Sequence, residues 1–245
     1  MEKITNLQQV KSVAHSLLMT DIHPTEFSPA IVKHPFTDSG IVALNNNGEI
    51  KLVDITKNAE HLNLWRSFLC NQIDNAKTAF QIYMMITKPY GLTFLKFANP
   101  YLSKKDSSSI LADAWLRSEN PNLDVNLSKS KLLAMFKSAE PTILMNEEDY
   151  RMFTALDDSV TVYRGVTSYN ANNVKALSWT LNQETAEWFA HRFDEDGTVY
   201  EAQIDKEHIY AFFNGRNESE VIVDPKHLKD INEVQEIDEG FILTQ

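Results

Sequence analysis

The chain of 245 residues has few of the residues that usually constrain a fold covalently or conformationally: one cysteine, seven glycines and eight prolines. A single cysteine excludes a disulfide within the chain. Cys70 falls on a helical apolar pattern, so a packed core residue is the simplest interpretation and a reactive thiol the alternative. The longest strongly apolar stretch, residues 80–86, is far too short to cross a bilayer. We therefore expect no membrane partner.

Several signatures of targeting and ligand binding are also missing. The N-terminus lacks a basic segment followed by a long apolar run, so we expect no secretory signal and a cytoplasmic protein. No glycine-rich loop precedes a Lys-Ser/Thr pair, and no G-x-G-x-x-G follows a strand-like segment, which argues against P-loop hydrolysis and against NAD as a hydride carrier. The seven histidines are scattered and no cysteines are paired, so no metal is expected.

Charge is concentrated in one half of the chain. Residues 1–150 contain 15 Lys/Arg and 16 Asp/Glu, a net charge of −1, whereas residues 151–245 contain 8 and 18, a net charge of −10; together they give the total of −11. An acidic half repels nucleic acid at long range but does not exclude a nucleic-acid acceptor, because local patches decide contact. A solvated acidic surface that aids solubility is the simpler interpretation.

Apolar periodicity predicts helices first and strands afterwards. An amphipathic helix is expected at 5–19, a turn-rich stretch at 20–40 and a hairpin at 41–53. Further helices are expected near 58–86, 91–98, 106–118, 128–139 and 146–156. Strands follow at 160–164, 175–180, 198–204, 208–213 and 219–224, with a helix at 182–193 and a tail, 231–244, that can add a strand pair. Helices followed by antiparallel strands indicate the α+β class.

Three short motifs in the strand region supply the needs of one reaction, the cleavage of a glycosidic bond at a ribose. Arg164 offers a planar fork of donors that matches diphosphate oxygens. Ser178 and Thr180, and likewise Glu218 and Glu220, are two residues apart, so on extended strands each pair faces one side. One carboxylate can stabilise an oxocarbenium-like centre, and the other can accept a proton from the incoming nucleophile.

In this order and approximate spacing, the motifs Arg164, Ser178-Trp179-Thr180 and Glu218-Ser219-Glu220 resemble the R-S-E class of mono-ADP-ribosyltransferases, which includes cholera-toxin-like and clostridial-toxin-like enzymes. The resemblance covers residues 160–224. The helical run at 112–136 matches the helical lobe of bacterial and prophage members more loosely. The family consumes NAD as a substrate and needs no metal.

The resemblance implies a role for each motif residue. Arg164 would bind the NAD phosphates, and Gly165 would let the backbone meet the nicotinamide amide. Ser178 would hydrogen-bond and position Glu220, which would contact the nicotinamide ribose and stabilise the cation. Glu218 would activate the acceptor. Thr180 would join the NAD-binding face, and a target-recognition loop would include Phe213, Asn214 and Arg216.

The implied fold is a helical lobe packed on a split antiparallel β-sandwich of the ADP-ribosyltransferase type. Residues 57–245 would form the transferase domain, with a helical lobe at 57–156 and an NAD-binding β core at 157–245. Residues 1–56 would be an N-terminal appendage of helix and hairpin. In the family, Glu-x-Glu goes with arginine acceptors, while some intracellular members modify nucleic acid.

The sequence is also similar to the RNA-modifying toxins of phage-defence toxin–antitoxin–chaperone systems. That similarity implies a bacterial toxin held by an antitoxin or inhibitor protein, or triggered by phage, with RNA as the acceptor, whereas Glu218 points to protein arginine. A prophage-carried enzyme that modifies host proteins would look much the same. Two alternatives stay open: an NAD glycohydrolase that uses water, and a non-catalytic binding module of the same fold.

Each motif residue also has an ordinary structural interpretation. A lone Arg164 is commonly a surface or ion-pair residue, and Glu-x-Glu before an apolar strand is commonly a solvated strand end. Trp179 would be a core residue or a pocket wall. Phe212 and Phe213 are either an exposed apolar loop suited to a macromolecular partner or the end of a core strand.

Overall fold

The computed structural model describes residues 3–46, 48–168, 170, 173–192 and 196–234. They belong to two compact units, Met1–Leu144 and Met145–Gln245, which are described separately. The chain is 45% helical and 24% strand, and its sheets are antiparallel, which agrees with the predicted α+β class.

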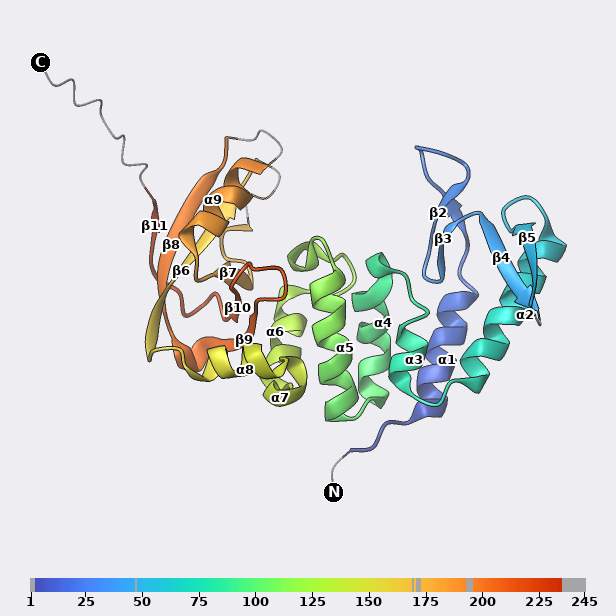
Figure 1. Cartoon of the computed structure of the whole chain (residues 1–245), viewed down its shortest axis with the longest axis horizontal. Coiled ribbons are helices and arrows are strands. Elements are labelled where there is room, and N and C mark those ends of the chain that lie inside the picture. Colours follow the sequence, from blue (N-terminus) through green and yellow to red (C-terminus); the bar gives the residue numbers. More distant parts are fainter. Residues whose placement is uncertain (1–2, 47, 169, 171–172, 193–195, 235–245) are drawn as a thin grey trace, which may run out of the picture. The chain divides into compact units, whose positions relative to one another are not determined.

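The N-terminal unit, Met1–Leu144, is mainly helical (Figure 1). Its α-helices are α1 (Leu7–Leu18), α2 (Ala59–Asn75), α3 (Ala79–Tyr83), α4 (Gly91–Ala98), α5 (Lys104–Arg117), α6 (Lys129–Ser138) and α7 (Pro141–Leu144). Short 3-10 turns lie at η1 (Lys88–Tyr90), η2 (Asn99–Tyr101) and η3 (Pro121–Leu123). Its strands are β1 (His23–Pro24), β2 (Ile31–His34), β3 (Thr37–Ser39), β4 (Ile41–Asn46) and β5 (Glu49–Asp54).

The helices of this unit enclose an apolar core. Helix α1 packs against α2, α3 and α4, so residues 1–56 share one compact unit with the helices that follow. Trp115 on α5 is 1% exposed and meets the Phe136 ring edge-on, with 5.1 Å between ring centroids. The predicted helix at 58–86 is divided because Ala76 is extended and the Thr78 side chain caps α3 by accepting from the Gln81 amide.

Two small sheets precede α2. The predicted hairpin is confirmed: β4 and β5 pair antiparallel, and Gly48 in their connection has a φ of 93°, which favours glycine. Residues 20–40 were predicted to be turns, but they also form the three-stranded sheet β1-β2-β3. His34 at the end of β2 is buried, and its Nδ1 accepts a hydrogen bond from the Phe36 amide at 3.1 Å.

The C-terminal unit, Met145–Gln245, contains one sheet and two α-helices among its described residues. Its elements are α8 (Glu147–Thr154), β6 (Ser159–Val166), β7 (Ser178–Thr180), α9 (Gln183–His191), β8 (Thr198–Asp205), η6 (Lys206–His208), β9 (Ile209–Phe213), β10 (Glu220–Val223) and β11 (Lys229–Glu233). Each expected strand and helix between 146 and 224 is present within a few residues. The part of the predicted tail beyond 234 lies outside the described residues.

The strand order is β11-β8-β6-β7-β10-β9, and all neighbours are antiparallel. β6 and β8 pair along their whole length, from Ser159 opposite Asp205 to Val166 opposite Thr198. The register between β6 and β7 consists of one described pair, Tyr163 opposite Thr180. Two three-stranded halves, β11-β8-β6 and β7-β10-β9, therefore meet at a narrow junction.

Helix α9 packs against β6 and β8, two neighbouring strands of this sheet (Figure 1). Ala186 and Ala190 on this helix are fully buried and cluster with Val199. The helix comes so close to β6 that a Cβ on Gly165 would lie 2.0 Å from the Ala186 carbonyl oxygen.

Candidate active site

The three motifs meet where the two halves of the sheet join. Thr180 on β7 is opposite Tyr163 on β6 and also opposite Glu220 on β10. Residues opposite one another in antiparallel strands point to the same face, as do residues two apart on one strand. Ser178, Thr180 and Glu220 therefore share one face of the sheet.

The contact that the resemblance implies between Ser178 and Glu220 is present. Ser178 Oγ donates to Glu220 Oε1 at 2.5 Å, and the Glu220 side chain is only 7% exposed. A hydroxyl that donates to a carboxylate forms a short, charge-assisted hydrogen bond. This bond fixes the direction of a carboxylate that heads a buried strand.

Arg164 lies beside this pair. Its Nη1 donates to the Ser178 carbonyl at 2.6 Å, and its Nε is buried without a hydrogen-bond partner among the described residues. Burial lowers the pKa of Arg164 to about 10, with the negative charge of Glu220 opposing the shift and the positive charge of Arg192 adding to it. The guanidinium therefore keeps its charge at neutral pH and lies within electrostatic reach of Glu220.

The Thr180 hydroxyl forms hydrogen bonds to main-chain atoms and not to a carboxylate. Its Oγ1 donates to the Glu218 carbonyl at 2.6 Å and accepts from the Asn182 amide at 3.0 Å. The first bond ties the segment before β10 to β7, and the second supports the turn into α9. Thr180 thus contributes to the position of Glu218 through main-chain contacts.

The geometry around Glu218 differs from the expected strand. β10 begins at Glu220, and Ser219 has a φ of 44°, so residues 218–220 are not extended and the alternation that was to place both carboxylates on one face does not apply. Glu218 Oε2 instead lies 2.9 Å from Arg216 Nη2. The positive φ was not visible in the sequence because the residue is a serine rather than a glycine.

The segment predicted as a recognition loop is only partly exposed. Phe212 and Phe213 are 2% and 3% exposed at the end of β9, so the core-strand interpretation is correct and the exposed apolar loop is not formed. Asn214 is half-buried, and the Arg216 side chain is 51% exposed. Of the predicted loop residues, Arg216 is the most exposed.

Asp149 is a member of the site region that no sequence motif indicated. It lies in the first turn of α8, where Asn146 Oδ1 accepts from the Asp149 amide at 2.8 Å and caps the helix. In addition, Asp149 Oδ1 accepts from the Asn214 amide at 3.1 Å, and burial raises the pKa of this carboxyl. Asn214 Oδ1 in turn accepts from the Ser219 amide at 3.0 Å. Asp149 thereby anchors the loop that leads to Glu220.

The contacts of Gly165 and Trp179 explain why these two residues suit their positions. Gly165 leaves room for the backbone of α9, because a Cβ there would also lie 2.6 Å from the Ala190 nitrogen. Trp179, expected in the core or in a pocket wall, is 2% exposed, and its Nε1 donates to the Ala176 carbonyl at 3.2 Å.

One group of side chains in this unit has the composition of a metal site. Donor atoms of Asp205, Glu207 and His208 all lie within 4.8 Å of one another. Lys229 Nζ, however, is 2.6 Å from Asp205 Oδ2, and this hydrogen bond holds the pKa of Asp205 below its usual range. A carboxylate already paired with a lysine is a poor ligand for a cation.

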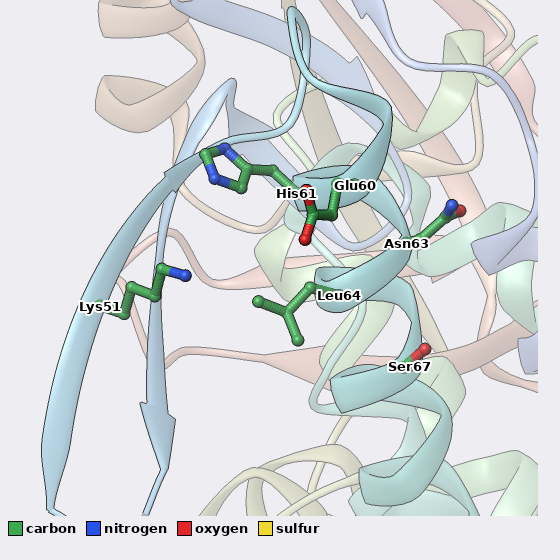
Figure 2. A pocket seen from close by; sticks show the side chains of 6 residues that line it. All are labelled: Lys51, Glu60, His61, Asn63, Leu64 and Ser67. Carbon is green, nitrogen blue, oxygen red and sulfur yellow. The ribbon is translucent and has the colours of Figure 1, made fainter.

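The N-terminal unit has an open pocket of about 400 Å³ between β5 and α2 (Figure 2). Figure 2 shows Lys51 projecting from β5 toward Leu64 on α2. The remaining lining residues, all on α2, are Glu60, His61, Asn63 and Ser67. None of the motif residues lines this pocket, so it is separate from the candidate active site.

Comparisons with protein-family models, with curated proteins and with solved structures gave no significant match. Among the described residues, no helix combines the length and the apolar character needed to cross a bilayer.

Proposed function

We propose that this chain is an NAD-dependent mono-ADP-ribosyltransferase that releases nicotinamide and transfers ADP-ribose to a macromolecule, either at a protein arginine or on RNA. The observation that carries the proposal is the hydrogen bond from Ser178 to Glu220 with the Arg164 guanidinium alongside it. A buried carboxylate and a partly buried arginine, held by one serine, suit a dinucleotide with a diphosphate and a reactive ribose.

Arg164 is suited to the diphosphate. A guanidinium has five N–H donors in a fork that matches phosphate oxygens, and one of them is used by the Ser178 carbonyl. The buried Nε, which has no hydrogen-bond partner among the described residues, needs an acceptor. A phosphate oxygen would supply that acceptor and would offset part of the cost of burying the charge.

Glu220 is suited to the ribose. As the bond between ribose C1′ and the nicotinamide nitrogen breaks, its electron pair moves to the pyridinium ring and positive charge develops on the ribose. A fixed carboxylate stabilises that charge most when it requires no reorganisation. Ser178 supplies the fixation. Glu218 would accept the proton that the acceptor loses as the new bond forms.

The architecture of the sheet also supports the proposal. Two three-stranded antiparallel halves that meet at one residue pair resemble the split sheet expected for this class of transferase. The three motifs lie on β6, β7 and β10, which are consecutive neighbours at that junction. The arrangement needs no metal, since the leaving group departs as neutral nicotinamide.

The test is nicotinamide release from NAD by the wild-type chain and by Glu220→Gln, with Glu187→Gln as the matched control. Glu187 is an exposed glutamate of the same unit whose contact is with Gln183, so its substitution removes the same charge outside the site. We expect release by the wild type and by Glu187→Gln. For Glu220→Gln we expect a loss of about 10²-fold or more, the size found when a charge-stabilising group is removed.

Incubation of labelled NAD with a bacterial lysate identifies the acceptor. Label that protease removes but ribonuclease does not would mean a protein acceptor, and label that only ribonuclease removes would mean RNA. Release of nicotinamide without a labelled macromolecule would mean a glycohydrolase. Absence of nicotinamide release by the wild type under all these conditions would contradict the proposal and favour a binding module.

A further inference from the structure

The ion pair between Arg216 and Glu218 places a guanidinium at the carboxylate proposed to activate the acceptor. Arg216 Nη2 is 2.9 Å from Glu218 Oε2, within the range of a charge-assisted hydrogen bond. The two side chains differ in exposure, with Glu218 at 22% and Arg216 at 51%. The carboxylate is thus largely covered, and the group that contacts it is accessible from solvent.

The loop that carries Arg216 is closed by its own hydrogen bonds. The Asn217 amide donates to the Asn214 carbonyl at 2.8 Å, and Asn217 has a φ of 56°, which together form a tight turn around Arg216. The Asn214 side chain accepts from the Ser219 amide, and its own amide is anchored by Asp149. The backbone around Arg216 is therefore preorganised.

The same loop is tied to the strand that positions Glu220. Thr180 Oγ1 donates to the Glu218 carbonyl at 2.6 Å, and the Leu181 amide donates to the Ser219 carbonyl at 3.1 Å. Consecutive Cα atoms are about 3.8 Å apart, so the Cα atoms of Glu218 and Glu220 are separated by at most roughly 7.6 Å. Arg216 therefore pairs with the residue two positions before the carboxylate proposed to hold the ribose.

We propose that Arg216 is itself an acceptor, so that the chain ADP-ribosylates its own recognition loop. This inference rests on the proposed transferase function. In the step, an Arg216 nitrogen forms a bond to ribose C1′ while the bond from C1′ to nicotinamide breaks. The electron pair of that bond neutralises the pyridinium, nicotinamide leaves, and the proton lost by the guanidinium passes to Glu218.

Tethering gives this internal acceptor an advantage over water. Well-oriented groups in one molecule reach effective concentrations of roughly 10⁵ M or more, far above that of any solution acceptor. The modified side chain would carry a diphosphate and could no longer pair with Glu218 in the same way. Self-modification would therefore add negative charge to the loop that carries Arg216.

The experiment incubates the purified full-length chain with NAD alone, without an added acceptor, and measures both released nicotinamide and the mass of the intact protein. We expect a mass increase of one ADP-ribosyl group, which fragmentation places on Arg216. Arg216→Lys should lose the increase. Arg151→Lys is the matched control, because Arg151 is an exposed arginine of the same unit whose Nη2 lies 4.0 Å from Glu148, and it should keep the increase.

The two readouts separate failure of the inference from failure of the proposed function. Nicotinamide release with an unmodified chain, or with the added mass on another residue and retained in Arg216→Lys, would overturn self-modification while leaving the enzyme intact. No nicotinamide release would overturn both. Labelling of a Glu220→Gln chain by dilute wild-type protein would show transfer between molecules and would contradict the tethered step.

Discussion

The N-terminal and C-terminal units differ in the polar groups that they bury. Among the described residues, the N-terminal unit buries no carboxylate, and its buried polar side chains are His34, Thr37, Thr93 and Ser108. The C-terminal unit buries three carboxylates, Asp149, Glu220 and Asp224. Burying a charged or polar group costs free energy unless hydrogen bonds or opposite charges compensate. An apolar core of this kind serves stability, whereas buried carboxylates need a further reason.

In the C-terminal unit, the hydrogen bonds around two of these carboxylates suggest that reason. Asp149 fixes the loop before β10, and Ser178 fixes Glu220 at its start. Both contacts hold one segment in position rather than fill a core. Among the described residues, buried carboxylates therefore distinguish the unit that carries the candidate site, and the open pocket of Figure 2 lies in the other unit.

The largest effect on stability is expected from Trp115→Ala, which tests the apolar core of the N-terminal unit. Trp115 is 1% exposed and meets Phe136 edge-on, so its truncation leaves a cavity and should lower the free energy of unfolding by about 3–5 kcal/mol. Urea denaturation followed by circular dichroism measures this loss. NAD turnover below the transition should persist. A loss under about 1 kcal/mol would mean that the site collapses around the smaller residue.

A smaller loss of stability is expected from Gly165→Ala, which tests the packing of α9 in the C-terminal unit. The added Cβ would collide with backbone atoms of Ala186 and Ala190, which cannot move aside as a side chain would. We expect a loss of about 1–3 kcal/mol, typical of overpacking. Gly215→Ala is the control, because a Cβ there meets nothing within 4 Å. Equal effects of the two substitutions in urea denaturation would contradict this account.

Ser178→Ala should lower both turnover and stability, because the Ser178 hydroxyl donates to a buried carboxylate. Hydrogen bonds to charged groups contribute about 1.5–3 kcal/mol, so loss of the bond to Glu220 should slow nicotinamide release by roughly 10- to 100-fold. Ser159→Ala, on the solvent-exposed start of β6, is the control and should leave the rate unchanged. An unchanged rate in Ser178→Ala would mean that Glu220 needs no positioning by this hydroxyl.

The sequence was sufficient to predict most elements of the C-terminal unit and the meeting of three motifs. Alternating apolar residues specify strands locally, and the order of the motifs on β6, β7 and β10 led to the contact between Ser178 and Glu220. The strands β1–β3 were missed because they are two to four residues long and lie among Pro24, Pro29 and Pro35. Such strands are specified by tertiary pairing rather than by periodicity.

Details that depend on contacts between distant residues could not be predicted. The hydrogen bond from the Asn214 amide to Asp149 joins residues 65 positions apart, and no local sequence pattern predicts it. The turn at Ser219, with its positive φ, reorients Glu218 toward Arg216 and removes the simple strand geometry that the motif suggested. The need for Gly165 likewise arises from the path of α9, which begins 18 residues later at Gln183.

A pH-dependent effect on stability is expected from His34, which can show whether the N-terminal unit responds to pH by itself. Burial lowers the pKa of His34 to about 4, and its Nδ1 must stay unprotonated to accept from the Phe36 amide. An unfolded histidine has a pKa of about 6.5. Between these values the unfolded state binds more protons, so the free energy of unfolding falls as the pH decreases from about 6.5 to about 4 and is fully retained above that window.

Urea denaturation of the wild type and of His34→Gln, at pH 7.5 and at pH 5, isolates this contribution, because the carboxylates common to both proteins cancel in the difference. The wild type should lose more stability than the variant between the two pH values. The difference should appear in the unfolding of the N-terminal unit, where the His34 ring packs edge-on against Trp65. The same pH dependence in both proteins would mean that His34 can be protonated without unfolding, for example by rotation of its ring toward solvent.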